Sequence, residues 1–86
     1  MFNIIEKFMR NLKIEQLDSF ARKNNVYLNS EELNYTYRFV MNNWQAIIHN
    51  PNILDLNKYK KNFSEENFFK INNLFISYKA KYQNFL

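Results

Sequence analysis

The side chains of this 86-residue chain that could take part in catalysis are few and scattered. The only histidine is His49, and the nearest acidic residue along the sequence is Asp55, beyond Pro51. A catalytic or zinc-binding histidine needs partner ligands at a defined spacing, such as HExxH, and the chain has no cysteine and no second histidine. We therefore expect His49 to be a helix-end residue that interacts with the helix dipole.

The other nucleophiles and acids also lack the neighbours that catalysis needs. The four serines have no GxSxG setting, and a chain without glycine has no oxyanion loop or phosphate-binding loop of the usual kinds. The acidic pairs Glu31-Glu32 and Glu65-Glu66 stand at expected helix starts, where capping and the helix dipole explain them. We predict a protein that is not an enzyme, with no metal, no cofactor and no small-molecule substrate.

In the first half of the chain, apolar residues recur every three or four positions, which is helical spacing. The pattern predicts helices and one extended link (26–28), the helices covering about 2–12, 14–24 and 30–49. Asn24-Asn25 stops the second helix, and Asn29 or Ser30 caps the third. The third helix is apolar on two faces, which is typical of a central helix packed against several others. The apolar residues of these two faces are Leu33, Tyr35, Tyr37, Phe39, Val40, Met41, Trp44, Ile47 and Ile48.

In the second half, a weaker helical pattern covers roughly 53–62, and Ser64 then caps a long final helix over about 65–84. No alternation of apolar and polar residues persists long enough to predict a strand. We therefore predict one all-α domain over 1–86, a compact bundle of four to five helices with the helix at about 30–49 in its centre. The apolar stripe of the final helix comprises Phe68, Ile71, Phe75, Tyr78, Tyr82 and Phe85.

The expected compartment follows from the absence of cysteine and of long apolar runs. Small secreted domains often depend on disulfides, and this chain has none. The segment 1–11 contains Glu6, Lys7 and Arg10, so it lacks the uninterrupted apolar region of a signal peptide. No apolar run approaches the roughly 20 residues that span a bilayer. We expect a cytoplasmic protein with no membrane partner.

The basic residues suggest one of two candidate interaction surfaces. The net charge is +4, and residues 51–86 hold six Lys and Arg against three Asp and Glu. Tyr27 and Tyr59 lie near the basic clusters and could stack on nucleic-acid bases. A solvated basic face is the alternative, and Glu31-Glu32 would repel phosphate groups. The candidate phosphate contacts are Arg22, Lys23, Lys58, Lys60 and Lys61.

Residues 14–33 also resemble helix–extended–helix modules of the SAP and LEM types, some of which bind DNA. The likeness is carried by Ile14-Glu15-Gln16-Leu17, by the link Val26-Tyr27-Leu28, and by Ser30-Glu31-Glu32-Leu33. Many such links contain a glycine, which this one lacks. The resemblance implies DNA binding as an alternative function.

The aromatic end of the final helix is the other candidate surface. A helix over about 65–84 would be roughly 30 Å long, about the width of a domain of this size. Tyr78, Tyr82 and Phe85 would then form a docking patch or a dimer seam unless the first helix covers them. We predict protein–protein interaction, most simply self-association, as the function.

The order of elements over most of the chain resembles a family of short uncharacterised proteins, a domain of unknown function found mainly in low-GC Gram-positive bacteria. The likeness rests on Leu17 to Ala21, the link at 26–28, the helix start Ser30-Glu31-Glu32, and Ile71 to Phe75. The resemblance implies an all-α bacterial protein. It supplies no activity and no functional residue.

Overall fold

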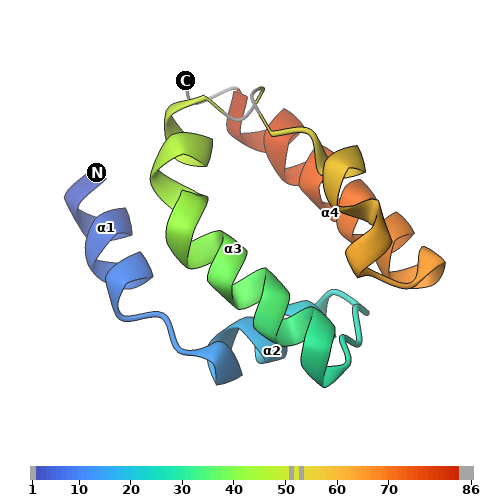
Figure 1. Cartoon of the computed structure of the whole chain (residues 1–86). Coiled ribbons are helices and arrows are strands. Elements are labelled where there is room, and N and C mark those ends of the chain that lie inside the picture. Colours follow the sequence, from blue (N-terminus) through green and yellow to red (C-terminus); the bar gives the residue numbers. More distant parts are fainter. Residues whose placement is uncertain (1, 51, 53, 84–86) are drawn as a thin grey trace.

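The computed structural model describes residues 2–50, 52 and 54–83, and the side chains of 4–50, 52 and 54–80. Over these residues the chain forms helices and no strand, so the predicted all-α fold is confirmed. The elements are α1 (Phe2–Arg10), α2 (Ile14–Lys23), α3 (Ser30–His49), the 3₁₀ helix η2 (Leu56–Asn62) and α4 (Glu65–Gln83). Figure 1 shows α3 between α1 and α4, with α1 and α2 packed against α3 and η2 packed against α4.

The stop after α2 uses asparagine in place of glycine. Asn25 has a φ of 66°, in the left-handed region that asparagine tolerates better than most residues. The Val26 N–H then donates to the Ala21 carbonyl at 2.8 Å, which closes the helix end. Val26 is the most deeply buried apolar residue described, at 2% exposure, so it anchors the predicted extended link in the core.

The two apolar faces predicted for α3 pack against different elements. On one face Trp44 is buried, and the Tyr37 hydroxyl donates to the Leu12 carbonyl between α1 and α2. On the other face Tyr35 and Phe39 contact aromatic rings that η2 and the residue after it contribute. The structure therefore confirms α3 as the central helix, with the bounds that its caps predict.

Glu32 joins the start of α3 to the start of α4. It forms a capping box with Asn29, in which the Asn29 side chain accepts from the Glu32 N–H at 2.8 Å and the Glu32 carboxylate accepts from the Asn29 N–H at 3.0 Å. The same carboxylate accepts from the Ser64 N–H at 2.8 Å and from the Asn67 side-chain amide at 2.9 Å. Glu32 is only 4% exposed, so this carboxylate is the polar centre of the fold.

Asn67 extends this polar bridge to a third segment. Its side-chain amide also donates to the Tyr27 carbonyl at 2.9 Å, and its N–H donates to the Ser64 hydroxyl at 3.1 Å. The second bond confirms Ser64 as the N-cap of α4. Because Glu32 and Asn67 satisfy one another and the backbone, their burial does not leave unpaired polar groups.

The environment of Glu32 predicts an acid-sensitive fold. Burial acts to raise the pKa of Glu32, but the hydrogen bonds from Asn29, Ser64 and Asn67 outweigh burial and lower the pKa below its usual value of 4.5. A lowered folded-state pKa gives stability that is fully present above the unfolded value and is lost as the pH falls through the folded value. We therefore expect the urea concentration at the unfolding midpoint, measured by the fluorescence of Trp44, to decrease as the pH is lowered below about 4.5.

The variant Glu32→Gln isolates this contribution from that of the other acidic residues. It should show a shallower decline in stability between about pH 5 and 3 than the wild type. If the stability of the two proteins declined equally with falling pH, Glu32 would not be the residue that makes the fold sensitive to acid.

The segment before α4 is a 3₁₀ helix, shorter than the helix predicted over 53–62. η2 begins after Asp55, whose carboxylate accepts from the Asn57 N–H at 3.1 Å. This Asp55 cap sets the start of η2 later than the apolar pattern indicated. Residue 53 lies outside the described residues.

Candidate functional site

The outer face of α4 carries large apolar side chains that nothing in the described chain covers. Phe69 is 67% exposed and Ile76 is 54% exposed. They stand seven residues apart, about two turns, so they lie on one face of the helix with the exposed Asn73 and Ala80 beside them. We refer to Phe69, Asn73, Ile76 and Ala80 as the outer stripe of α4.

Charge is distributed unequally along this helix. Glu65 and Glu66 occupy its first turn, and Lys79 stands near its other end. Glu66 also forms an ion pair with Lys70 at 3.4 Å, one turn later. One end of the outer stripe is therefore flanked by negative charge and the other by positive charge, and each sign complements the helix dipole at its own end.

The surface predicted at the aromatic end of α4 is only partly within the described residues. Tyr78 is half-buried, and its ring lies 6.0 Å from that of Phe20 on α2. The backbone of Tyr82 belongs to α4, but its side chain and all of Phe85 lie outside the described residues. Tyr78 thus faces the interior with the other members of its stripe, Phe68, Ile71 and Phe75, which are all half-buried.

The outer stripe was not predicted from the sequence because a longer apolar pattern marks the inner face of the same helix. Phe69 and Ile76 do not fit the alternating spacing of three and four that marks the inner face. Two large apolar residues seven apart, each directly after a residue of the inner stripe, were the available signal. On α1, Ile4 and Phe8 form a second exposed apolar pair, at 75% and 60% exposure.

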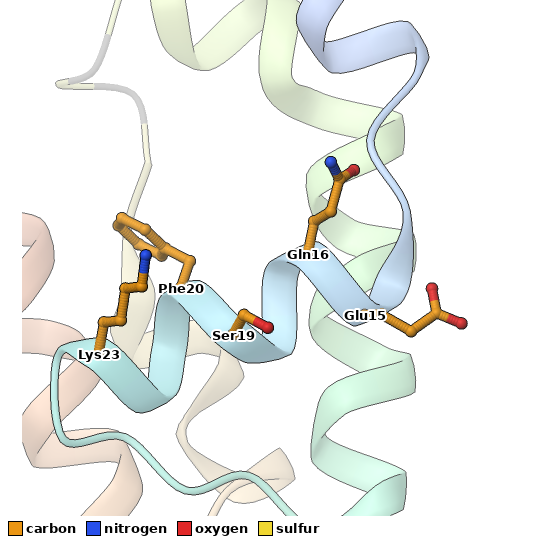
Figure 2. A pocket seen from close by; sticks show the side chains of 5 residues that line it. All are labelled: Glu15, Gln16, Ser19, Phe20 and Lys23. Carbon is orange, nitrogen blue, oxygen red and sulfur yellow. The ribbon is translucent and has the colours of Figure 1, made fainter.

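The structure does not gather the basic residues into one described hollow. Lys58, Lys60 and Lys61 line one beside η2 that also contains Glu65. Lys23 lines another on α2, and Figure 2 shows Lys23 and Phe20 near one end of this helix and Glu15 near the other. All five basic candidates are exposed.

Arg22 is engaged within its own segment. It forms an ion pair with Asp18 at 3.1 Å, and its guanidinium lies over the Tyr27 ring at 5.7 Å from the centroid. The Lys60 amine similarly lies 6.0 Å from the centroid of the Phe68 ring. Contacts of this kind are typical of a solvated basic surface. Nucleic-acid binding therefore stays a prediction, and no arrangement of the described basic residues favours it.

A cavity of about 240 Å³ lies between α2, α3, η2 and α4 and is partly open to solvent. No polar surface lines it. An apolar space of this size leaves the side chains that line it without packing partners on one side. The whole chain also exposes 6636 Å², against about 5,500 Å² for a typical monomer of its mass.

The remaining candidates do not form a metal-binding cluster among the described side chains. His49 lies exposed in the last turn of α3, as predicted. Within the described part of the chain, no group of three His, Asp or Glu side chains is placed to hold a metal ion. None of the helices over these residues has the length and apolar character needed to cross a membrane.

Comparisons with known proteins give no relative for this chain. It matches no protein-family model, and searches of curated proteins and of solved structures find no similar protein or fold. The resemblances to a Gram-positive bacterial family and to SAP and LEM modules therefore stay predictions.

Proposed function

We propose that this protein is a non-enzymatic assembly protein that associates with a second copy of itself through the outer stripe of α4. The observation that carries this proposal is the exposure of Phe69 and Ile76 on one face of α4, a helix whose start is capped by Ser64. Exposed apolar side chains that are grouped in this way mark interaction surfaces, whereas single exposed apolar residues are common and need no explanation.

The charges of α4 favour an antiparallel pair of α4 helices. If Phe69 faces Ile76 of the second copy, the two-fold axis falls between residues 72 and 73, and Ile76 faces Phe69 of the second copy in turn. The same register places Glu65 and Glu66 opposite Lys79 of the second copy. Antiparallel helices also oppose their macrodipoles. Charge complementarity of this kind sets orientation more than affinity.

The size of the stripe predicts a weak dimer. Its four side chains span about three turns of one helix, which is less than the roughly 800 Å² per partner of a standard stable interface. α1 offers a less suitable surface for a symmetric pair, because it is nine residues long, whereas α4 has nineteen residues. We expect association to depend on concentration over the high-micromolar range.

Phe69→Asp is expected to make the protein monomeric at concentrations where the wild type dimerises, because a buried unpaired carboxylate would face the apolar side chains of the second copy. Sedimentation equilibrium at several concentrations measures this directly. The matched control is Phe8→Asp, which removes a similarly exposed phenylalanine from α1 and should leave the dimer intact.

Both variants should keep the helical circular dichroism of the wild type, since both positions are exposed. A monomeric wild type at millimolar concentration would contradict the proposal. Equal loss of association in Phe69→Asp and Phe8→Asp would also contradict it, because the α4 stripe would then not be the specific contact.

A further inference from the structure

We infer that the apolar cavity between α2, α3, η2 and α4 binds a small uncharged apolar molecule, such as a single aromatic ring or a short alkyl chain. This inference does not depend on self-association, because the outer stripe of α4 is on the opposite side of that helix from the residues that line the cavity. Nothing in the sequence pattern alone indicated such a site.

The chemistry of the ligand follows from the lining. The walls are mainly apolar and aromatic side chains from α2, α3, η2, α4 and the segments beside them. Thr36 is among the lining residues, but the surface that faces the space is apolar. A polar or charged group placed against this lining would give up hydrogen bonds to water and gain none from the apolar walls. The volume of about 240 Å³ exceeds the roughly 150 Å³ that holds benzene in an engineered protein cavity. The volume and the lining of the cavity therefore both fit one apolar ring or one short alkyl chain.

Specific contacts tie the elements that form the walls to one another at separate points. The Glu32 carboxylate fixes the start of α3 to Ser64 and Asn67. The aromatic rings of Phe39 and Tyr59 lie 4.8 Å apart and hold η2 on α3.

On the remaining side, Phe20 and Tyr78 connect α2 to α4. These contacts join different pairs of the elements that form the walls. Interiors of folded proteins are normally close-packed, so an apolar space of this size between elements tied in this way is suited to an occupant.

Toluene is a suitable probe, with phenol as its polar counterpart. Toluene is expected to raise the thermal unfolding midpoint of the wild type and to shift the methyl resonances of cavity residues such as Leu17, Val40 and Leu74. Phenol should bind more weakly than toluene, because burying its hydroxyl against the apolar lining costs hydrogen bonds to water. Phe69→Asp should bind toluene as the wild type does.

Val40→Phe tests the location by filling the cavity with a ring of the protein's own. This variant should lose the response to toluene, whereas Ala46→Phe, which adds the same ring at an exposed position of α3, should keep it. Ala21→Leu, on the α2 wall, serves the same purpose if Val40→Phe does not fold.

The inference is overturned if near-saturating toluene changes neither the unfolding midpoint nor the methyl resonances. It is also overturned if the toluene response persists in folded Val40→Phe or Ala21→Leu, or if phenol binds as tightly as toluene.

Discussion

Replacing Glu32 with alanine is expected to lower the free energy of unfolding by about 3–5 kcal/mol. The substitution removes the acceptor for the Asn29 N–H, the Ser64 N–H and the Asn67 amide together. Hydrogen bonds to a charged group are worth more than neutral ones, and the buried Asn67 amide would keep only its bond to the Tyr27 carbonyl. A chain of this length has a total stability of about 4–13 kcal/mol, so the loss in Glu32→Ala amounts to about a quarter of that total or more.

Glu31→Ala is the matched control, because Glu31 is the preceding residue in the same helical turn and is exposed. It loses only a dipole interaction worth at most about 1 kcal/mol. Urea unfolding followed by circular dichroism compares the two variants with the wild type. Similar losses for Glu31→Ala and Glu32→Ala would show that the bridge from α3 to α4 does not hold the fold together.

Trp44→Ala is expected to cost about 3–5 kcal/mol. Trp44 is the bulkiest of the described buried residues, at 7% exposure, and it shares a face of α3 with Tyr37, which bonds to the α1–α2 connection. Its removal leaves a large void on the face that holds α1 and α2. Thermal unfolding followed by circular dichroism should show a greatly lowered midpoint or no cooperative transition.

Tyr27→Ala provides the comparison, because Tyr27 is 59% exposed and its structural hydrogen bond is made by its backbone carbonyl. It should cost less than about 1 kcal/mol, from its contact with Arg22. A cooperative transition for Trp44→Ala at the temperature of the Tyr27→Ala transition would contradict the assignment of Trp44 to the core.

Much of the fold could be predicted because local signals agree with the tertiary structure. Asn29 and Ser64 are good N-caps, Asn25 tolerates a positive φ, and two apolar faces marked α3 as central. The start of η2 was missed because the Asp55 side chain caps a tight turn inside an otherwise apolar segment. Side-chain caps of this kind compete with the apolar pattern and are difficult to rank from sequence.

The candidate sites were harder to predict because they depend on tertiary position. Glu32 has the sequence signature of a helix-start carboxylate, and its hydrogen bonds to Ser64 and Asn67 join residues more than 30 positions apart. The apolar cavity draws its lining from four elements, which a pattern within one helix does not reveal. The outer stripe of α4 was visible as a spacing of seven, but the stronger inner stripe of the same helix obscured it.

The most direct test of self-association through α4 uses the absence of native cysteine. In the antiparallel register, residue 73 lies beside the two-fold axis, so Asn73→Cys should form a disulfide-linked dimer on mild oxidation and revert on reduction. Ser77→Cys, exposed on the same helix, would place the two sulfur atoms about 13 Å apart along the axis, too far to bond. Rapid dimer formation by Asn73→Cys and not by Ser77→Cys is the predicted result. Equal cross-linking of the two variants, or none in either, would contradict the account.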